Sequence, residues 1–406
     1  MRRKINLLAH LVKYGIIDLF AGIGGVSAGF QDTGHFDVIA LVDIDRECME
    51  TYKANYPRAT YLLRDMADIG GDEILAVADG REIDGVIGCP PCQGYSDAGK
   101  RDPANPLNRL VNDYFRVVNS TKPKFIVMEN VPGILAQPSF REILKEVASI
   151  GYDLWYGVLN SALFGVPQTR QRAIVLGYRR DLGITPTPPE ATHYGSRQIF
   201  DYSTKALVDL DGPRATKALG VCPSSARINT LGIGDVPWLR YCPCDYVNLK
   251  DLPPVVNCKD AIGDLPQPTA RGEAEIINGH IAWGHTAELV ARLSYVPEGG
   301  NLSDIGQKKR YFSQAYARLH SMGLGFTIST HFHNPGSGRF LHYNDTRSLT
   351  VREAARLQTL SDLGDLKDGF QFVKSLKASE RMIGNAFPTA MARAIARRVY
   401  DSLGSK

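Results

Sequence analysis

Short apolar runs alternate with helix-like segments over residues 14 to about 180, and this alternation strongly constrains the fold. The run Phe125-Ile126-Val127-Met128 is apolar throughout, as expected for a strand that is covered on both faces. We therefore predict an α/β fold with a Rossmann-like, doubly wound, mostly parallel sheet. The predicted strands are Gly15–Leu19, Phe36–Val42, Ile83–Ile87, Phe125–Met128, Leu154–Leu159 and Ala173–Leu176.

The chain changes character twice after this region. Residues 181–345 are rich in Pro, Gly, Asn and Asp and show neither helical nor strand periodicity, which predicts a smaller, loop-rich domain. Helical patterns return over 346–406, where Thr350-Val-Arg-Glu353 has the form of a capping box and Pro388 precedes a helix predicted from Thr389 to about Leu403. We therefore predict a first domain over 14–180, a second domain over 181–345, and C-terminal helices over 346–406 that return to the first domain.

Composition sets broad limits on the protein class. The chain has 47 Lys plus Arg and 43 Asp plus Glu, and a net charge of +4 permits a polyanionic partner without requiring one. Its seven cysteines form no disulfide pattern, which favours a reducing cytoplasm. The apolar stretch 7–12 is interrupted by His10 and runs into the first strand without a cleavage site, so we expect no export signal. No apolar run is long enough to span a membrane.

A glycine-rich turn follows the first predicted strand, in the segment Asp18–Gly25. Such a turn lets a ligand approach the backbone closely, although Ser27 stands where the dinucleotide fingerprint has its third glycine. Asp43 ends the next strand and could bind both hydroxyls of a ribose, and Asp65 could accept from an exocyclic amine. The pattern predicts a nucleoside-like ligand; the alternative is a plain turn with two solvated acids.

The run Gly88-Cys-Pro-Pro-Cys-Gln-Gly-Tyr-Ser96 places a cysteine on a proline-stiffened loop after a predicted strand. Cys92 is either a nucleophile or one half of a Cys89/Cys92 redox pair. The residues after Cys92 continue as a loop and not as the helix that a redox unit requires, which favours the nucleophile. Cys89 is then interpreted as a small packing residue.

Polar residues follow other predicted strands in the same way. Glu129 comes directly after Met128, where a carboxyl group could share a proton with a ring nitrogen or could simply begin a helix. Extended chain over 168–172 would put Arg170 and Arg172 on one face, able to clamp a carbonyl or an anion; the alternative is a solvated edge. The turn Gly384-Asn385 could expose backbone polar groups or merely separate two helices.

Taken together, these motifs resemble the cytosine-C5 DNA methyltransferase family, of the bacterial restriction-modification type. The resemblance covers residues 15 to about 178 and 346 to about 400. It is carried by motifs in the family's order: Asp18–Gly25, Pro91-Cys92-Gln93, Glu129-Asn130-Val131, Gln168–Arg172, Arg347–Gln358 and Gly384-Asn385. The resemblance implies S-adenosylmethionine as methyl donor, double-stranded DNA as substrate and a monomeric enzyme, and it suggests a cognate restriction endonuclease.

The family's donor-binding positions carry over residue by residue. The resemblance implies that Asp43 binds the ribose hydroxyls, Ile44 covers the adenine and Asp65 reaches its amine. Asp43 stands where the family usually has Glu, so the arm is shorter but the charge is kept. The residues implied at the methyl donor are Phe20, Ala21, Gly22, Gly24, Gly25, Asp43, Ile44, Asp65, Met66, Pro91, Leu110, Asn385 and Ala386.

The family's mechanism assigns the catalytic residues. The resemblance implies that the Cys92 thiolate adds to C6 of cytosine, that Glu129 holds or protonates N3, and that Arg170 holds O2. Arg172 would brace Glu129 and the loop. Because these steps cannot occur inside a stacked duplex, the base must be flipped out.

Target recognition is expected within 181–345. Candidate DNA contacts, some of them on the loop after Cys92, are Ser96, Lys100, Arg101, Arg109, Arg227, Asn229, Arg240, Arg310, Asn334 and Arg339. An RNA cytosine methyltransferase on the same scaffold is one alternative, but the long region 181–345 favours DNA. A non-catalytic homologue is another. The cysteines at 222, 242, 244 and 258 could bind zinc, but their spacing favours free thiols, and we predict no metal site.

Overall fold

The computed structural model describes residues 13–91, 109–194, 198–209, 251–306, 314–360 and 369–404, together with the backbone of 239–240. Several predicted site residues lie outside these ranges: Cys92, Ser96, Lys100, Arg101, Arg227, Asn229, Arg310 and the cysteines at 222, 242 and 244. For Arg240 only the backbone is described.

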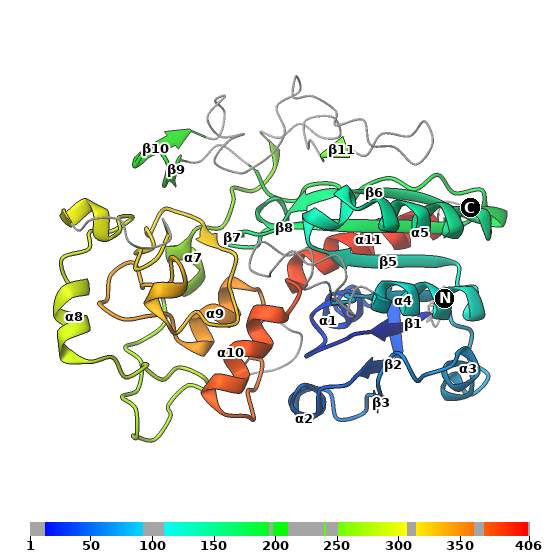
Figure 1. The fold of residues 1–406 in the computed structure, drawn as a ribbon, viewed down its shortest axis with the longest axis horizontal. Coiled ribbons are helices and arrows are strands. Elements are labelled where there is room, and N and C mark those ends of the chain that lie inside the picture. The colour runs from blue at the N-terminus through cyan, green and yellow to red at the C-terminus, as the bar shows by residue number, and fades with distance from the viewer. Residues whose placement is uncertain are drawn as a thin grey trace, which may run out of the picture.

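The centre of the molecule is an eight-stranded sheet with the order β11-β6-β8-β5-β4-β1-β2-β3 (Figure 1). Strand β8 runs antiparallel to β5 and β6, and the other neighbours pair in parallel, which confirms the predicted fold class. The strands are β1 Tyr14–Leu19, β2 Phe36–Asp43, β3 Tyr61–Leu63, β4 Gly85–Gly88, β5 Phe125–Asn130, β6 Tyr152–Asn160, β8 Gln171–Arg179 and β11 Leu239–Arg240.

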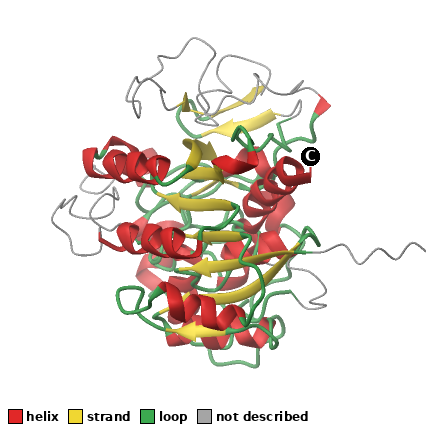
Figure 2. Ribbon diagram, turned by 90° about the vertical axis from the view of Figure 1, so that its right-hand side faces the viewer, coloured by secondary structure: helices red, strands yellow, loops and turns green. Residues whose placement is uncertain are grey.

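Helices cover both faces of this sheet (Figure 2). Alternate strand residues point to opposite faces, so Val127 joins one buried apolar cluster, with α1 and α11, while Ile126 and Met128 join another, with α3, α4 and α5. The helices around the sheet are α1 Gly25–Gln31, α2 Arg46–Asn55, α3 Gly71–Ala78, α4 Leu110–Thr121, α5 Pro138–Ser149 and α11 Thr389–Gly404. Among the described residues, none of the helices has the length and apolarity needed to cross a membrane.

A second group of short elements lies beside the sheet (Figure 1). Strand β12 pairs with β7, and β9 pairs with β10. The elements of this part are β7 Gln168–Thr169, β9 Gln198–Asp201, β10 Ala206–Asp209, β12 Gly325–Phe326, α7 Cys258–Ile262, α8 Ala287–Leu293, α9 Val351–Leu357 and α10 Leu376–Asn385. Short 3-10 helices complete the chain: η3 Pro132–Ala136, η4 Ser161–Phe164, η5 Arg180–Leu182, η8 Leu302–Ile305 and η9 Pro335–Ser337.

The C-terminal helices divide between the two parts of the molecule. The capping box is present, because Thr350 accepts from the backbone N–H of Glu353 and the Glu353 carboxylate accepts from the backbone N–H of Thr350. Helix α9 packs with α7 and α10 in a buried cluster that includes Ile328 and Phe332. Helix α11 instead returns to the sheet and packs against α1. The two helices lie so close that a Cβ added to Gly29 of α1 would lie 2.5 Å from the side chain of Ala392 in α11. The proposed boundaries at 180 and 345 remain predictions.

Candidate active site

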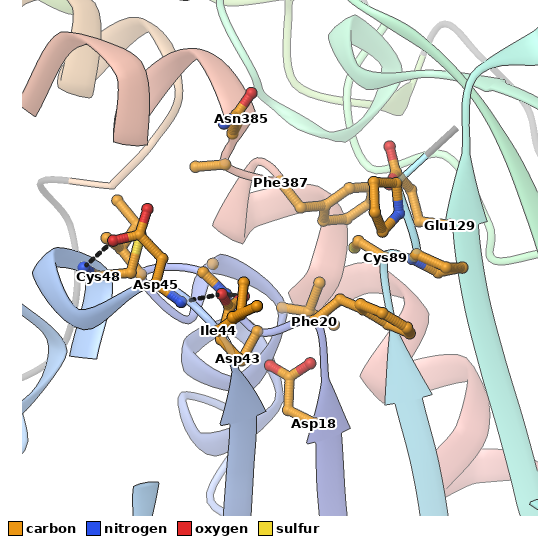
Figure 3. A pocket seen from close by; sticks show the side chains of 18 of the residues that line it. Asp18, Phe20, Asp43, Ile44, Asp45, Cys48, Cys89, Glu129, Asn385 and Phe387 are labelled. Carbon is orange, nitrogen blue, oxygen red and sulfur yellow. Dashed lines mark hydrogen bonds between the residues drawn. The ribbon is translucent and has the colours of Figure 1, made fainter. Parts of the chain in front are cut away.

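A cavity of about 600 Å³ opens at the carboxyl ends of β1, β2, β4 and β5, where open α/β sheets bind ligands. The chain passes from β1 to β2 on one side, while β4 lies on the other, so this is the point where the strand order reverses. Of the predicted donor-binding residues, the cavity is lined by Phe20, Ala21, Gly22, Gly25, Asp43, Ile44, Asp65, Met66, Pro91, Leu110, Asn385 and Ala386. Figure 3 shows several of these side chains facing the same space.

The glycine-rich turn forms one wall of the cavity. Phe20, Gly22 and Gly24 all have positive φ, at 57°, 55° and 77°. Gly24 precedes α1 and is not among the residues that line the cavity, and a Cβ there would lie 2.1 Å from the ring of Tyr52. Backbone conformation and packing each require glycine at this position, and its place beside the methyl donor stays a prediction.

Asp43, at the end of β2, connects the glycine-rich turn to this strand by hydrogen bonds. Its carboxylate accepts from the backbone N–H of Gly22 at 2.8 Å and of Asp45 at 2.9 Å. Burial raises the pKa of Asp43, while these two donors oppose the rise. The neighbouring Ile44 is 67% exposed in the ligand-free cavity, which provides an apolar surface on which a flat ring can lie.

Asp18, at the start of the turn motif, is a lining residue that sequence reasoning did not single out. Its side chain accepts from the Ser27 hydroxyl, but Oδ1 is buried and has no hydrogen-bond partner among the described residues. Burial raises the pKa of Asp18 to about 7. An unpartnered carboxylate oxygen beside a ligand cavity favours a positively charged ligand group.

Glu129 and Arg172 form an ion pair on the opposite side of the cavity. Arg172 Nε lies 2.7 Å from Glu129 Oε1, and both side chains are only 13% exposed. The antiparallel pairing of β5 with β8 brings the two residues together, since Glu129 pairs with Ile174, two residues from Arg172. The predicted bracing contact is therefore present, whereas the catalytic role remains to be tested.

Arg170 lies deeper in the same wall and is 3% exposed. Among the described residues, its guanidinium makes long contacts, with the carbonyl of Ile328 at 3.4 Å and that of Gly384 at 3.4 Å. Nε has no partner among the described residues, and burial, assisted by Arg172, lowers the pKa of Arg170 to about 9. Arg170 is thus a buried cation with unused donor capacity, as a group that binds a substrate oxygen should be.

The segment leading to Cys92 is held against β5. The Asn130 side chain donates to the carbonyl of Pro90 at 3.0 Å, and Pro91 lines the cavity next to Cys89. Burial raises the pKa of the Cys89 thiol well above its ordinary value, with the nearby Glu129 carboxylate adding to the rise, so Cys89 does not supply a thiolate. Cys92 itself lies outside the described residues.

Three predicted DNA contacts can be placed. Arg109 lines the cavity, and Asn334 is exposed while its side chain caps η9. Arg339 does not fit the prediction: it is 3% exposed, donates to the carbonyls of Gly299 and Arg318, and lies over the ring of Tyr202. Because its guanidinium is already paired and buried, Arg339 holds the fold together and is not available to a base edge.

Two further lining residues, Asp45 and Arg381, form an ion pair between α2 and α10. Asp45 caps α2, and its position before Arg46-Glu47 was a readable N-cap signal.

Cys258 is buried as a free thiol at the start of α7. Within the described ranges, no group of three His, Cys, Asp or Glu side chains could hold a metal ion.

Comparison with known proteins decides the family. The chain matches the C-5 cytosine-specific DNA methylase family over residues 14–232 and 250–401. It belongs to this family. The enzyme is thus a DNA cytosine-5 methyltransferase, and the resemblance inferred from its motifs is confirmed.

Similar proteins span nearly the whole chain. The methyltransferase is 32% identical over 401 residues to the Type II methyltransferase M1.HphI of Haemophilus parahaemolyticus, covering 97% of this chain and 88% of that protein. It is 33% identical over 405 residues to M.XorII of Xanthomonas oryzae pv. oryzae, covering 96% and 85%.

Solved structures support the fold. A protein described as a DNA modification methyltransferase encoded within an E. coli prophage superposes with a TM-score of 0.66 at 22% identity, covering 96% of this chain and 99% of that chain. A DNMT2 variant from Spodoptera frugiperda superposes with a TM-score of 0.60 at 14% identity, covering 96% and 100%.

Proposed function

We propose that this methyltransferase transfers a methyl group from S-adenosylmethionine to C5 of a cytosine flipped out of a specific duplex DNA sequence. The observation that carries the proposal is the single cavity that joins a nucleoside-binding half, around Asp43 and Ile44, to the Glu129–Arg172 pair. A donor and a base held in the two halves would face each other, which removes most of the entropic cost of bringing them together.

The cavity residues fit S-adenosylmethionine. Asp18 offers an unpartnered carboxylate oxygen to a positively charged ligand, and Asp43 keeps further acceptor capacity beside its two backbone donors. Ile44 presents an apolar surface to the adenine, and Asp65 lies on the same wall. The donor, when bound, supplies an electrophilic methyl group on a sulfonium centre.

The protein's residues would activate the base. Cytosine C5 is a poor nucleophile, so we infer that the Cys92 thiolate adds to C6 and makes C5 electron-rich. Glu129, fixed by Arg172, would share a proton with N3, while Arg170 would donate to O2 as negative charge develops on the ring. C5 would then take the methyl group with release of S-adenosylhomocysteine. It would next lose its proton to a solvent base as the C6–S bond breaks, which returns the Cys92 thiolate.

Burial of these groups supports base flipping. Glu129 and Arg172 are each 13% exposed and Arg170 is nearly inaccessible, so a base stacked within a duplex could not reach them. Extruding the base costs a few kcal/mol, which contacts in the cavity would offset. We place target recognition within 181–345 and the catalytic domain in 14–180, with a monomer acting on double-stranded DNA in the cytoplasm.

A role in restriction-modification follows from the relatives, which are Type II methyltransferases. Methylation of the target sequence would protect the host DNA from a cognate restriction endonuclease. Resistance of DNA from cells that express the protein, tested against a panel of endonucleases, would identify the protected sequence.

The test of the reaction is methyl transfer from labelled S-adenosylmethionine to duplex DNA, with tRNA in parallel and Cys92→Ala as the control. Labelled DNA that is lost in the variant supports the proposal, and sequencing of the product gives the site. Labelling of tRNA alone would replace DNA by RNA as the substrate. Donor binding without transfer to either would overturn the proposed reaction.

A further inference from the structure

Helix α10 contacts two different regions through two adjacent faces. Residues four apart lie on the same face of a helix. Glu380 and Gly384 therefore share one face of α10, and Arg381 and Asn385 share the adjacent face. The first face contacts the segment 328–334, and the second lines the cavity through Arg381 and Asn385; Gly384, at the end of the first face, lines the cavity as well. Figure 1 shows α10 between α9 and the sheet with its helices α1 and α2. The helix therefore contacts part of the predicted target-recognition region and also lines the predicted donor pocket.

The first face fixes the segment 328–334 at two points. Glu380 is 1% exposed, and its carboxylate accepts from the backbone N–H of His333 at 2.6 Å and lies 2.7 Å from Nδ1 of the same residue. One turn along, a Cβ added to Gly384 would lie 2.5 Å from the backbone of Ser329 and Thr330. Such close contacts leave little freedom for the segment to move independently of the helix.

Outward-facing residues of the same loop remain open to a partner. His331 and Asn334 are exposed, while the buried Phe332 between them anchors the loop in the apolar core. The His333 carbonyl accepts from the Ser348 hydroxyl at 2.8 Å, which ties the loop to the residue two before the α9 cap. A ligand that contacts His331 or Asn334 would therefore act on a loop whose position Glu380 determines.

The second face leads to the donor pocket by a continuous set of contacts. Arg381 pairs with Asp45 and lies 2.8 Å from Glu47. The backbone N–H of Asp45 donates to Asp43, and Asp43 accepts in turn from Gly22 of the glycine turn. The helix then ends at Asn385, which lines the cavity.

We propose that Glu380 is a positioning residue that couples DNA binding by the segment 328–334 to donor binding, with His333 as its partner. The inference rests on the proposed function and adds the physical link between the two ligands. Two ligands that favour the same position of a shared element are energetically linked, and the link is reciprocal: each ligand tightens the other by the same factor.

The experiment measures that factor directly. The dissociation constant of S-adenosylhomocysteine is determined by calorimetry with the wild-type chain, alone and with saturating cognate duplex, and the duplex is then titrated with and without the nucleoside. We expect a coupling factor of about tenfold in both directions. In Glu380→Gln and His333→Ala the factor falls toward one, while affinity for the nucleoside alone stays within about threefold, since neither residue touches the donor pocket.

Controls separate coupling from folding. Lys377→Gln changes an exposed charge on the same helix and should leave the factor unchanged. The double variant Glu380→Gln/His333→Ala should lose no more coupling than either single variant. Both substitutions disrupt the same contact, between the Glu380 carboxylate and the His333 ring. Thermal unfolding confirms that each variant is folded.

The outcomes distinguish the two proposals. A wild-type factor that survives in both folded variants overturns the role of Glu380, and so does a wild type that binds both ligands without any coupling. A wild type that binds neither the nucleoside nor DNA overturns the proposed function and, with it, the coupling.

Discussion

The two halves of the cavity differ in charge and in how they are held. At β1 and β2, the groups are carboxylates and backbone N–H donors, with Asp18, Asp43 and Asp65 facing the space. At β5 and β8, the cavity is lined by Glu129 and its ion-pair partner Arg172, and by Arg170, which directly precedes β8. The acidic half is set by local turns, whereas the arginine half depends on strands that are distant in sequence.

From this difference we infer that the acidic half of the cavity binds the methyl donor and that the arginine half acts on the base. Carboxylates suit a ligand that brings a cation, hydroxyls and an amine, and arginines suit a ring whose oxygen gains negative charge. Changes in the acidic half should therefore weaken donor affinity, and changes in the arginine half should slow the chemical step. The following predictions test whether the two halves can be separated in this way.

The largest effect is expected for Glu129→Gln. The amide cannot share a proton with N3 and loses the ion pair with Arg172, so kcat should fall by about 10²- to 10⁴-fold, while S-adenosylhomocysteine affinity changes little. Single-turnover methyl transfer and calorimetry measure the two quantities. Glu146→Gln, an exposed acid on α5, is the matched control. A loss confined to donor affinity would contradict the division.

Arg170→Lys should affect both halves of the cavity, with a fall in kcat and a smaller fall in affinity for S-adenosylhomocysteine. A lysine lacks the planar, multi-donor guanidinium that contacts the carbonyls of Ile328 and Gly384, and burial would push its ammonium toward the neutral form. We expect kcat to fall by roughly 10²-fold, about 3 kcal/mol of transition-state stabilisation. Because Gly384 precedes Asn385 of the donor pocket, affinity for the nucleoside should also fall a few-fold. Unchanged transfer kinetics would exclude Arg170 as the oxygen-binding group.

The acidic half was readable from sequence because its geometry is local. A turn motif and the strand-end acids placed Phe20, Gly22, Asp43 and Asp65 at one edge of the sheet, as observed. The strand core was equally readable, since β5 is apolar on both faces. At Gly24 the sequence cannot separate the possible reasons for glycine, because positive φ and tight packing select this residue just as ligand approach does.

Long-range partners could not be read in the same way. The residues around Arg339 in the sequence do not show whether it contacts a base or donates to buried backbone carbonyls. In the structure it donates to two carbonyls that are 21 and 40 residues away. The same holds for α10, whose contacts with Asp45 and His333 cross 336 and 47 positions of the chain. Burial and pairing are decided by the assembled fold, which residue types alone do not specify.

Asp43→Ala probes the acidic half. The substitution removes the acceptor for Gly22 and Asp45, leaving two backbone donors without their partner. We expect affinity for S-adenosylhomocysteine to fall about tenfold or more, with kcat at saturating donor within about threefold of the wild type. Asp43→Glu should recover part of the affinity by restoring a carboxylate. A large loss of kcat at saturation would show that the halves are not independent.

The smallest effect concerns Asp18 and is seen in the pH dependence. Burial raises the pKa of Asp18 from its ordinary 3.8 to about 7, so between about pH 4 and pH 7 the ligand-free native state holds a proton that the unfolded chain has lost. The free energy of unfolding should therefore decrease as pH rises across this window. Asp18→Asn cannot ionise, and its unfolding free energy should lack this slope.

Donor binding should show the opposite trend. A cationic ligand group favours the ionised carboxylate, so wild-type affinity for S-adenosylhomocysteine should rise a few-fold as pH rises through about 7, whereas Asp18→Asn should show no such rise. Thermal unfolding and calorimetry from pH 5 to 8, with and without the nucleoside, measure both trends. If wild type and variant gave parallel affinity profiles, the charge of Asp18 would play no part in the acidic half, and its unpartnered oxygen would be only a cost of burial.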